Sequence, residues 1–314
     1  MTAAKLLRHE TILAVLTVIA LAVLASLSDK FFTTENLLNQ GRLMSEVGLV
    51  ALAMTFVIVT GGIDLSVGSI LGLTAILLGV FWKNLGLPLP MAMLAAVACG
   101  TFAGWMNGFI ITRFRVPPLI ATLATLALYR GLAEGISEAR SVRGYPEWFF
   151  FFGQGEVLGV PFQVWLLGIA TVVAAVILGF TPFGRATYAI GANETAARFS
   201  GIRVNATKLW IYTAAGFLSA LAAVVFVSRV TTTRSDMGTG LELDVITGVV
   251  LGGTSIFGGR GTIIGTVLGL ILIQALKNGL SLSGVKGDGT IVVIGLVLIG
   301  AILAGALFDK NRGG

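Results

Sequence analysis

The feature that most constrains this chain is a succession of apolar runs, each nearly long enough to cross a lipid bilayer. A membrane-spanning helix needs about 20 residues, and the 314-residue chain holds ten candidate runs. Only 11% of the residues are charged, compared with about 25% in soluble domains, so a soluble fold could not cover its surface with polar groups. The sequence therefore predicts an all-α, polytopic membrane protein with about ten transmembrane helices, forming a single transmembrane domain over residues 1–314. The runs cover about 11–28, 43–60, 68–83, 91–112, 117–136, 161–180, 208–228, 243–257, 262–279 and 290–308.

The distribution of Lys and Arg orients these helices. When residues are counted on alternate sides of the runs, more Lys and Arg lie on the side of loop 181–207 than on the side of the loops near 137–160 and 229–242. Positively charged loops stay in the cytoplasm, so we expect both termini and 181–207 to be cytoplasmic and the other two loops to be external. The net charge of +6 then reflects topology and not a nucleic-acid site. Runs 243–257 and 262–279 are short, so they could instead form a re-entrant hairpin.

Several kinds of chemistry are excluded by the residue types that the chain lacks. Its one cysteine, Cys99, and its one histidine, His9, exclude an internal disulfide, a Cys/His zinc site and a Ser-His-Asp triad. Residues 258–261 read Gly-Gly-Arg-Gly, but a P-loop ends in Gly-Lys-Ser/Thr so that the lysine reaches the phosphates, and no such string occurs. We therefore expect no enzyme activity, no metal and no cofactor on this chain, and we interpret 258–261 as a tight turn.

One short segment outside the apolar runs carries the signals of both helix ends. Asn193 is a favourable N-cap, Glu194 suits the positive end of a helix, and Gly201 suits the residue after the last turn. Ala196 and Ala197 keep one face of this predicted helix small, so another protein surface could approach it closely. Local physics alone leaves two readings open, a docking element and a solvated linker.

This segment resembles the Glu-Ala-Ala loop of the permeases of ATP-binding-cassette (ABC) importers. The matching string is Glu194-x-Ala196-Ala197-x-x-x-Gly201, with Ile211 ten residues further on, although Thr195 intervenes where the plain motif has no residue. Three longer strings, 61–68, 184–202 and 251–266, resemble the ribose-type sugar permeases. The similarity extends over about residues 40–305.

The resemblance implies a permease subunit of the bacterial inner membrane that transports a monosaccharide or a similar sugar by alternating access. Residues 193–201 would be the coupling helix, which docks on ABC ATPase subunits that bind ATP and Mg²⁺. Further implied partners are a second permease subunit, identical or related, and an external solute-binding protein. A branched-chain amino acid permease shares the general frame and is the nearest alternative. Residues 234–238 resemble permeases of the rhamnose and autoinducer-2 branches.

The family's signature loops contain two glycine pairs, Gly61-Gly62 and Gly252-Gly253. They belong to an internal echo, because residues 59–68 resemble residues 250–259, and transporters often contain internal repeats. Asp64 follows the first pair at the start of a predicted helix, so N-capping is a sufficient reason for its presence.

Polar residues inside the runs are the remaining candidates. Asn107, Thr122 and Thr125 offer the amide and hydroxyl groups that a sugar requires along a translocation path, although hydrogen bonds between helices are the simpler explanation for each.

Charged residues inside the runs fall into two pairs. The spacings Arg42–Glu46 and Arg130–Glu134 favour two i,i+4 ion pairs that extend to an interface, and a role in substrate passage is the alternative. A secondary transporter driven by an ion gradient would require intramembrane carboxylates or broken helices. The sequence is poor in the former, and its Gly-rich hairpins leave the latter open.

Overall fold

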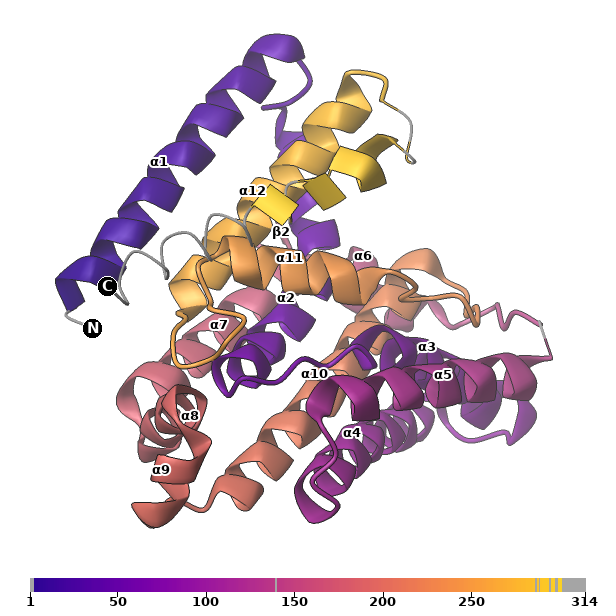
Figure 1. The fold of residues 1–314 in the computed structure, drawn as a ribbon. Helices are drawn as coiled ribbons and strands as arrows, with labels where there is room; N and C mark the ends of the chain where they lie inside the picture. Colours follow the sequence, from indigo (N-terminus) through magenta and orange to yellow (C-terminus); the bar gives the residue numbers. More distant parts are fainter. Residues whose placement is uncertain are drawn as a thin grey trace.

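The computed structural model describes residues 3–138, 140–285, 287, 289–293, 295–296 and 299–300, and these are mostly helical. The long helices pack around a central one, α2, in which every residue from Gly48 to Val59 is buried (Figure 1). The only two strands within the described ranges form a small hairpin. The helices are α1 (Ala3–Leu27), α2 (Thr34–Val59), α3 (Val67–Gly79), α4 (Leu89–Arg113), α5 (Pro118–Ser137), α6 (Phe151–Gln154), α7 (Phe162–Phe180), α8 (Pro182–Ala192), α9 (Glu194–Phe199), α10 (Val204–Val230), α11 (Leu241–Leu251) and α12 (Ile263–Leu282), and the strands are β1 (Glu156–Val157) and β2 (Val160–Pro161).

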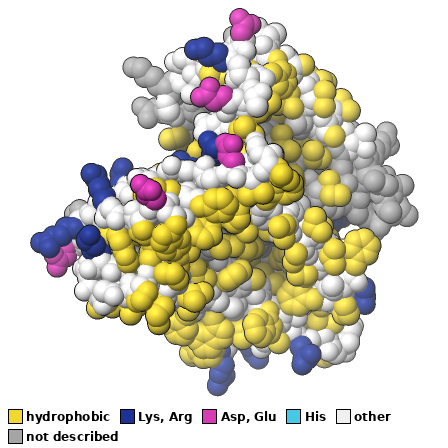
Figure 2. Space-filling model, turned by 180° about the vertical axis from the view of Figure 1, so that it is seen from behind, with side chains coloured by type: hydrophobic (Ala, Val, Ile, Leu, Met, Phe, Trp, Pro, Cys, Tyr) yellow, Lys and Arg dark blue, Asp and Glu magenta, His cyan; other side chains and the backbone are white. Residues whose placement is uncertain are grey.

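Seven helices in the described part of the chain are long and apolar enough to cross a bilayer. They are α2, α3 with its π-helical continuation to Asn84, α4, α5, α7, α10 and α12. Each corresponds to one predicted run. Figure 2 shows hydrophobic side chains spread over much of one face, with charged side chains mainly toward its edges. The structure thus confirms a helical membrane protein with several spans, whereas the predicted total of about ten and the side on which each terminus lies stay predictions. The last run, 290–308, lies largely outside the described residues.

The predicted run 243–257 is only partly helical. Its helix, α11, has 11 residues, or about 16 Å at 1.5 Å per residue, about half of a hydrocarbon core. It ends because the chain turns at Gly252 and Gly253, and Gly253 has a φ of +89°, which favours glycine. Run 262–279, by contrast, becomes a 20-residue helix, α12.

The predicted loop 229–242 packs along α3. Its Thr233 side chain lies against Gly79 near the end of α3, and Gly238 touches Gly68 near its start. Residues 231–240 are not helical and consist mostly of turns, so some of their carbonyls need partners outside the segment, because unpaired polar groups are costly away from water. The Arg130 guanidinium supplies donors to the carbonyls of Ser235 and Met237, the latter at 2.9 Å.

Charged side chains between the helices pair over long distances in sequence. Glu46 accepts two hydrogen bonds from Arg229, at 2.7 and 3.0 Å, and Arg42 donates to Glu156 at 2.7 Å. The predicted i,i+4 pair between Arg42 and Glu46 is therefore wrong, and Arg130 uses backbone carbonyls in place of Glu134. The physical reason for Arg229 and Arg130 is that each reaches an acceptor on a buried residue of another element, Glu46 or Met237, which needs a partner. Arg42 instead pairs with the exposed Glu156.

Glycine brings α4 and α10 into backbone contact. A Cβ built on Gly104 would meet the carbonyl of Tyr212 and lie 2.7 Å from the backbone of Gly216. Such small-residue contacts let helices approach closely in a membrane, where apolar burial gives little net attraction between helices.

The pair Glu46–Arg229 should be important for stability. We expect Glu46→Gln to destabilise the protein by about 3–5 kcal/mol, because only 6% of the Glu46 side chain and 23% of the Arg229 side chain is exposed and the arginine would keep a buried charge without its partner. Arg234→Gln is the control, because that side chain and its partner Asp236 are 60% and 58% exposed. The measurement is thermal unfolding in detergent. Equal losses in the two variants would contradict this role.

The α4–α10 contact predicts opposite effects for two glycine substitutions. Gly104→Ala should cost about 1–3 kcal/mol through overpacking. Gly131→Ala in α5 meets no atom within 4 Å and should stabilise by about 0.5–1 kcal/mol through the lower backbone entropy of the unfolded chain. Unfolding midpoints of the two purified variants test the difference, and a stable Gly104→Ala variant would show that the helices can separate at no cost.

Candidate functional site

The first signature loop lies between α2 and α3 and is held by its own polar groups. Asp64 is fully buried, and its Oδ1 accepts hydrogen bonds from the amide and the hydroxyl of Ser66, at 2.9 and 2.6 Å. The cap position of α3 is Ser66 and not Asp64, and the Ser66 side chain makes no capping bond. Asp64 therefore shapes the turn before the helix. Gly61, with a φ of +76°, allows the preceding reversal of the chain.

The predicted path residues surround this loop. Asn107 donates to the Ser66 hydroxyl at 2.7 Å, and Thr122 donates to the carbonyl of Ile63 at 3.1 Å. The Thr125 hydroxyl lies 3.3 Å from the carbonyl of Thr122. All three side chains are buried. The structure thus brings α4 and α5 to the signature loop through these residues, and a role along the translocation path stays a prediction.

The two echoing segments touch each other. The amide of Gly259 donates to the carbonyl of Val59 at 2.8 Å, and a Cβ on Gly258 would lie 2.8 Å from the amide nitrogen of Gly61. Gly258 and Gly259 have φ values of +85° and +73°. The second signature pair lies earlier in the same connection, where Gly252 packs against the start of α12 at Gly265. The predicted tight turn, 258–261, therefore lies at the end of the connection between α11 and α12, and it meets the first signature loop.

The predicted surface helix is confirmed as α9. The Asn193 side chain accepts from the amide of Ala196 at 2.9 Å, and Gly201 follows the helix with a φ of +81°. Glu194 and Arg198 occupy the first and last turns, where their charges complement the helix dipole.

The two alanines of α9 face in different directions. Ala197 is buried and packs with Ile190 and Val204, so its small size serves the contact of α9 with α8 and α10. Ala196 is exposed, as is Phe199, at 89%. The sequence does not single out Phe199, because one exposed apolar side chain is common on protein surfaces. The free face of α9 therefore carries Ala196 and Phe199.

Glu194 ties α9 to α10. Its carboxylate accepts from Lys208 at 2.5 Å and from Arg198 at 2.7 Å. Partial burial by itself raises the pKa of Glu194, but the hydrogen bonds from Lys208 and Arg198 outweigh it and hold the pKa below its ordinary value. The side chain is therefore ionised at neutral pH, and α9 is fixed to the first turns of α10.

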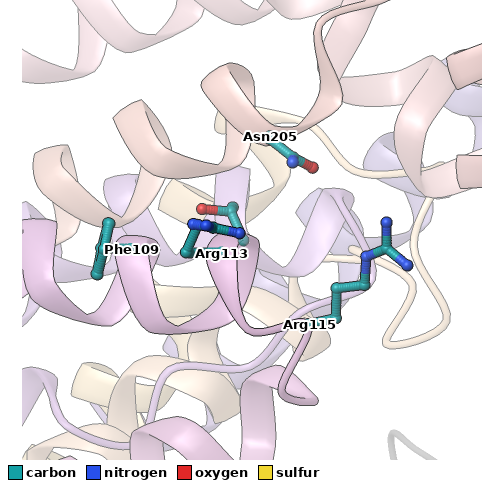
Figure 3. Close-up of a pocket in the computed structure, with 5 residues that line it drawn as sticks. Phe109, Arg113, Arg115 and Asn205 are labelled. Carbon is teal, nitrogen blue, oxygen red and sulfur yellow. The ribbon is translucent and has the colours of Figure 1, made fainter.

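A basic hollow adjoins α9. A cavity of about 460 Å³ lies between the end of α4 and the start of α10, lined by Phe109, Thr112, Arg113, Arg115 and Asn205. In Figure 3, Phe109 and Arg113 extend from α4 beneath the turn of α10 that carries Asn205, and Arg115 follows on the next turn of the chain. A neighbouring cavity of about 410 Å³ includes Glu194, Arg198 and Lys208. Among the described residues there is no cluster of three His, Cys, Asp or Glu side chains suited to a metal ion.

The sequence of this chain is similar to those of known transport proteins. A family model described as "Branched-chain amino acid transport system / permease component" matches residues 34–303. The chain is 42% identical over 296 residues to the ribose import permease protein RbsC of Bacillus subtilis, covering 94% of this chain and 90% of that protein. It is 40% identical to RbsC of Escherichia coli K12, covering 99% and 96%.

A third relative, the autoinducer 2 import system permease protein LsrD of E. coli O9:H4, is 37% identical, covering 89% of this chain and 86% of that protein. No solved structure matches the chain. The agreement extends over almost the full length of both RbsC proteins, and the matched region holds the glycine turns, α9 and all seven long apolar helices. The chain therefore belongs to the family of ribose-type permeases of bacterial ABC importers.

Proposed function

We propose that this chain carries a monosaccharide or a similar sugar across the bacterial inner membrane, as the membrane-spanning subunit of an ATP-driven importer. The observation that carries the proposal is its identity of 40–42% to ribose import permeases over almost the whole chain. The name of the family model mentions branched-chain amino acids, but the relatives that are 40–42% identical to this chain are ribose import permeases. The similarity to LsrD extends the candidate substrates to autoinducer 2.

In this proposal the chain supplies part of the translocation path for the sugar and a docking site for the ATPase subunits. ATP and Mg²⁺ would bind to separate ABC ATPase subunits, whose docking site would be the free face of α9 and the basic hollow beside it. Four observations support this placement: α9 lies outside the long apolar helices, both of its ends are defined, its Phe199 is exposed, and Arg113 and Arg115 give the adjoining cavity a positive charge suited to an acidic surface. A solute-binding protein would deliver the sugar on the opposite side.

The broken crossing formed by 231–240 and α11 supports movement during transport. Transporters place discontinuous helices at the sites where access alternates. Here a half-length helix follows a non-helical segment, 231–240, that consists mostly of turns and lies against α3. A second permease subunit, identical or related, would complete the path between two such chains.

If an ATPase subunit docks on α9, substitutions at the two ends of α9 should uncouple sugar uptake from ATP hydrolysis. We expect Glu194→Ala and Gly201→Val, tested separately in proteoliposomes with the ATPase and the sugar-binding protein, to reduce sugar uptake by about tenfold, the scale of strong coupling residues. ATP hydrolysis should continue. Glu194→Ala frees α9 from Lys208, and Gly201→Val forces a branched side chain into a φ of +81°. Uptake of radiolabelled ribose and release of phosphate are measured together.

Thr213→Val is a matched control. Its hydroxyl donates only to the carbonyl of Leu209, one turn earlier in α10, so the substitution should leave both rates unchanged. Full sugar uptake in both α9 variants would reject the docking role. Uptake of leucine and not of ribose by the unaltered complex would favour the amino acid alternative.

A further inference from the structure

The last turn of α8 is in backbone contact with both glycine turns. A Cβ built on Gly191 would overlap the carbonyl oxygen of Val59 and the amide nitrogen of Gly259. A Cβ on Gly258 would lie 3.0 Å from the carbonyl oxygen of Gly191. Gly191 therefore sits where the turn after α2 and the turn after α11 meet, and any side chain larger than hydrogen would separate the three backbones.

Hydrogen bonds close this junction on two sides. The amide of Gly259 donates to the carbonyl of Val59 at 2.8 Å and thus joins the two turns directly. The Tyr188 hydroxyl donates to the carbonyl of Gly261 at 2.6 Å. Tyr188 and Gly191 are three residues apart and therefore on the same face of α8. This face of α8 contacts the turn after α2 through Gly191, and it contacts the turn after α11 through both Gly191 and Tyr188.

The junction connects α9 with four longer elements. Only Asn193 separates α8 from α9, and Figure 1 shows these two helices at one end of the molecule beside the loop between α11 and α12. The turn at Val59–Gly61 leads from α2 to α3, and the turn at Gly258–Gly261 leads from α11 to α12. A displacement of α9 thus reaches the ends of two helix pairs at a single point.

The backbone contact between α8 and the two turns should transmit a displacement of α8 to both turns almost completely. Side chains can absorb a movement by changing rotamer, whereas three backbones in van der Waals contact cannot, and packed interiors have low compressibility. The contacts of α9 with α10 are made by side chains: Glu194 pairs with Lys208, whose side chains are 40% and 12% exposed, and Ala197 packs against Val204. The long side chains of this ion pair can adjust by changing rotamer.

We propose that Gly191, together with the turns at 59–61 and 258–261, forms one rigid joint that passes movement of α9 to α2–α3 and to α11–α12. Gly191 is then a positioning residue of the transport cycle, and Tyr188 keeps the joint closed. This inference rests on the proposed function, in which an ATPase subunit moves α9. It gives the internal echo a mechanical role, because the two similar segments are the two parts that α8 holds together.

The test measures sugar molecules imported per ATP hydrolysed, in proteoliposomes that contain the ATPase and a ribose-binding protein. Residues that carry coupling between sites change it by about 2- to 30-fold, so we expect Gly191→Ala to lower this ratio by about tenfold and Tyr188→Phe by about threefold. Gly179→Ala in α7 is the matched control, because no atom lies within 4 Å of its Cβ. The control should keep the ratio of the unaltered protein.

Loss of structure alone would lower the amount of assembled complex but not the ratio. If Gly191→Ala fails to assemble, Tyr188→Phe, which loses one hydroxyl and little volume, decides the question. If both variants assemble, an unchanged ratio in both would overturn the joint. If only Tyr188→Phe assembles, an unchanged ratio in that variant would overturn it. Either result would leave the proposed function intact. Absence of ATP-dependent ribose uptake in the unaltered complex would instead reject the proposed function.

Discussion

Close contact between backbones is the constraint on which the rest of this structure depends. Lipid solvates apolar side chains as well as a protein interior does, so helices in a bilayer associate mainly through van der Waals contact and hydrogen bonds. Glycine gives the closest approach, and it occurs at the contacts between α4 and α10, between α3 and residues 231–240, and between α11 and α12. Many of the 42 glycines of the chain are therefore a requirement of its packing and not only a mark of its turns, whereas a Cβ added at others, such as Gly131 and Gly179, would meet no atom within 4 Å.

Close packing also permits the irregular backbone that transport requires. A non-helical segment in an apolar environment must find partners for its amides and carbonyls. The segment 231–240 finds them in Arg130, whose guanidinium serves two carbonyls, and in the α3 glycines that allow it to lie close. The signature loop after α2 is fixed in the same way by Asn107 and Thr122. Polar side chains within the helices thus stabilise the non-helical segments at which other helices end.

Sequence reasoning succeeds where the signal is local. The seven long apolar helices and the capped helix α9 follow from composition, from run length and from the placement of Asn193 and Gly201. It fails where the partner is distant in sequence. Spacing alone suggested that Glu46 pairs with Arg42, but its partner Arg229 is 183 residues away, and no local pattern identifies it. Likewise, the length of the apolar run 243–257 does not reveal that α11 ends at Leu251, although the glycine pair that follows is a turn signal.

The same distinction applies to the candidate site. The sequence identifies α9 and both glycine pairs as separate features and even relates the two echoing segments, yet it cannot show that those segments meet. Their contact through Gly259 and Val59 depends on how α2 and α11 end beside each other. α9 is attached to α10 by the Glu194–Lys208 ion pair and by Ala197 against Val204, and to the turns by the packed backbone of α8. A force applied at α9 would therefore reach the turns through α8, and the long helices that begin or end at those turns would be acted on at their ends.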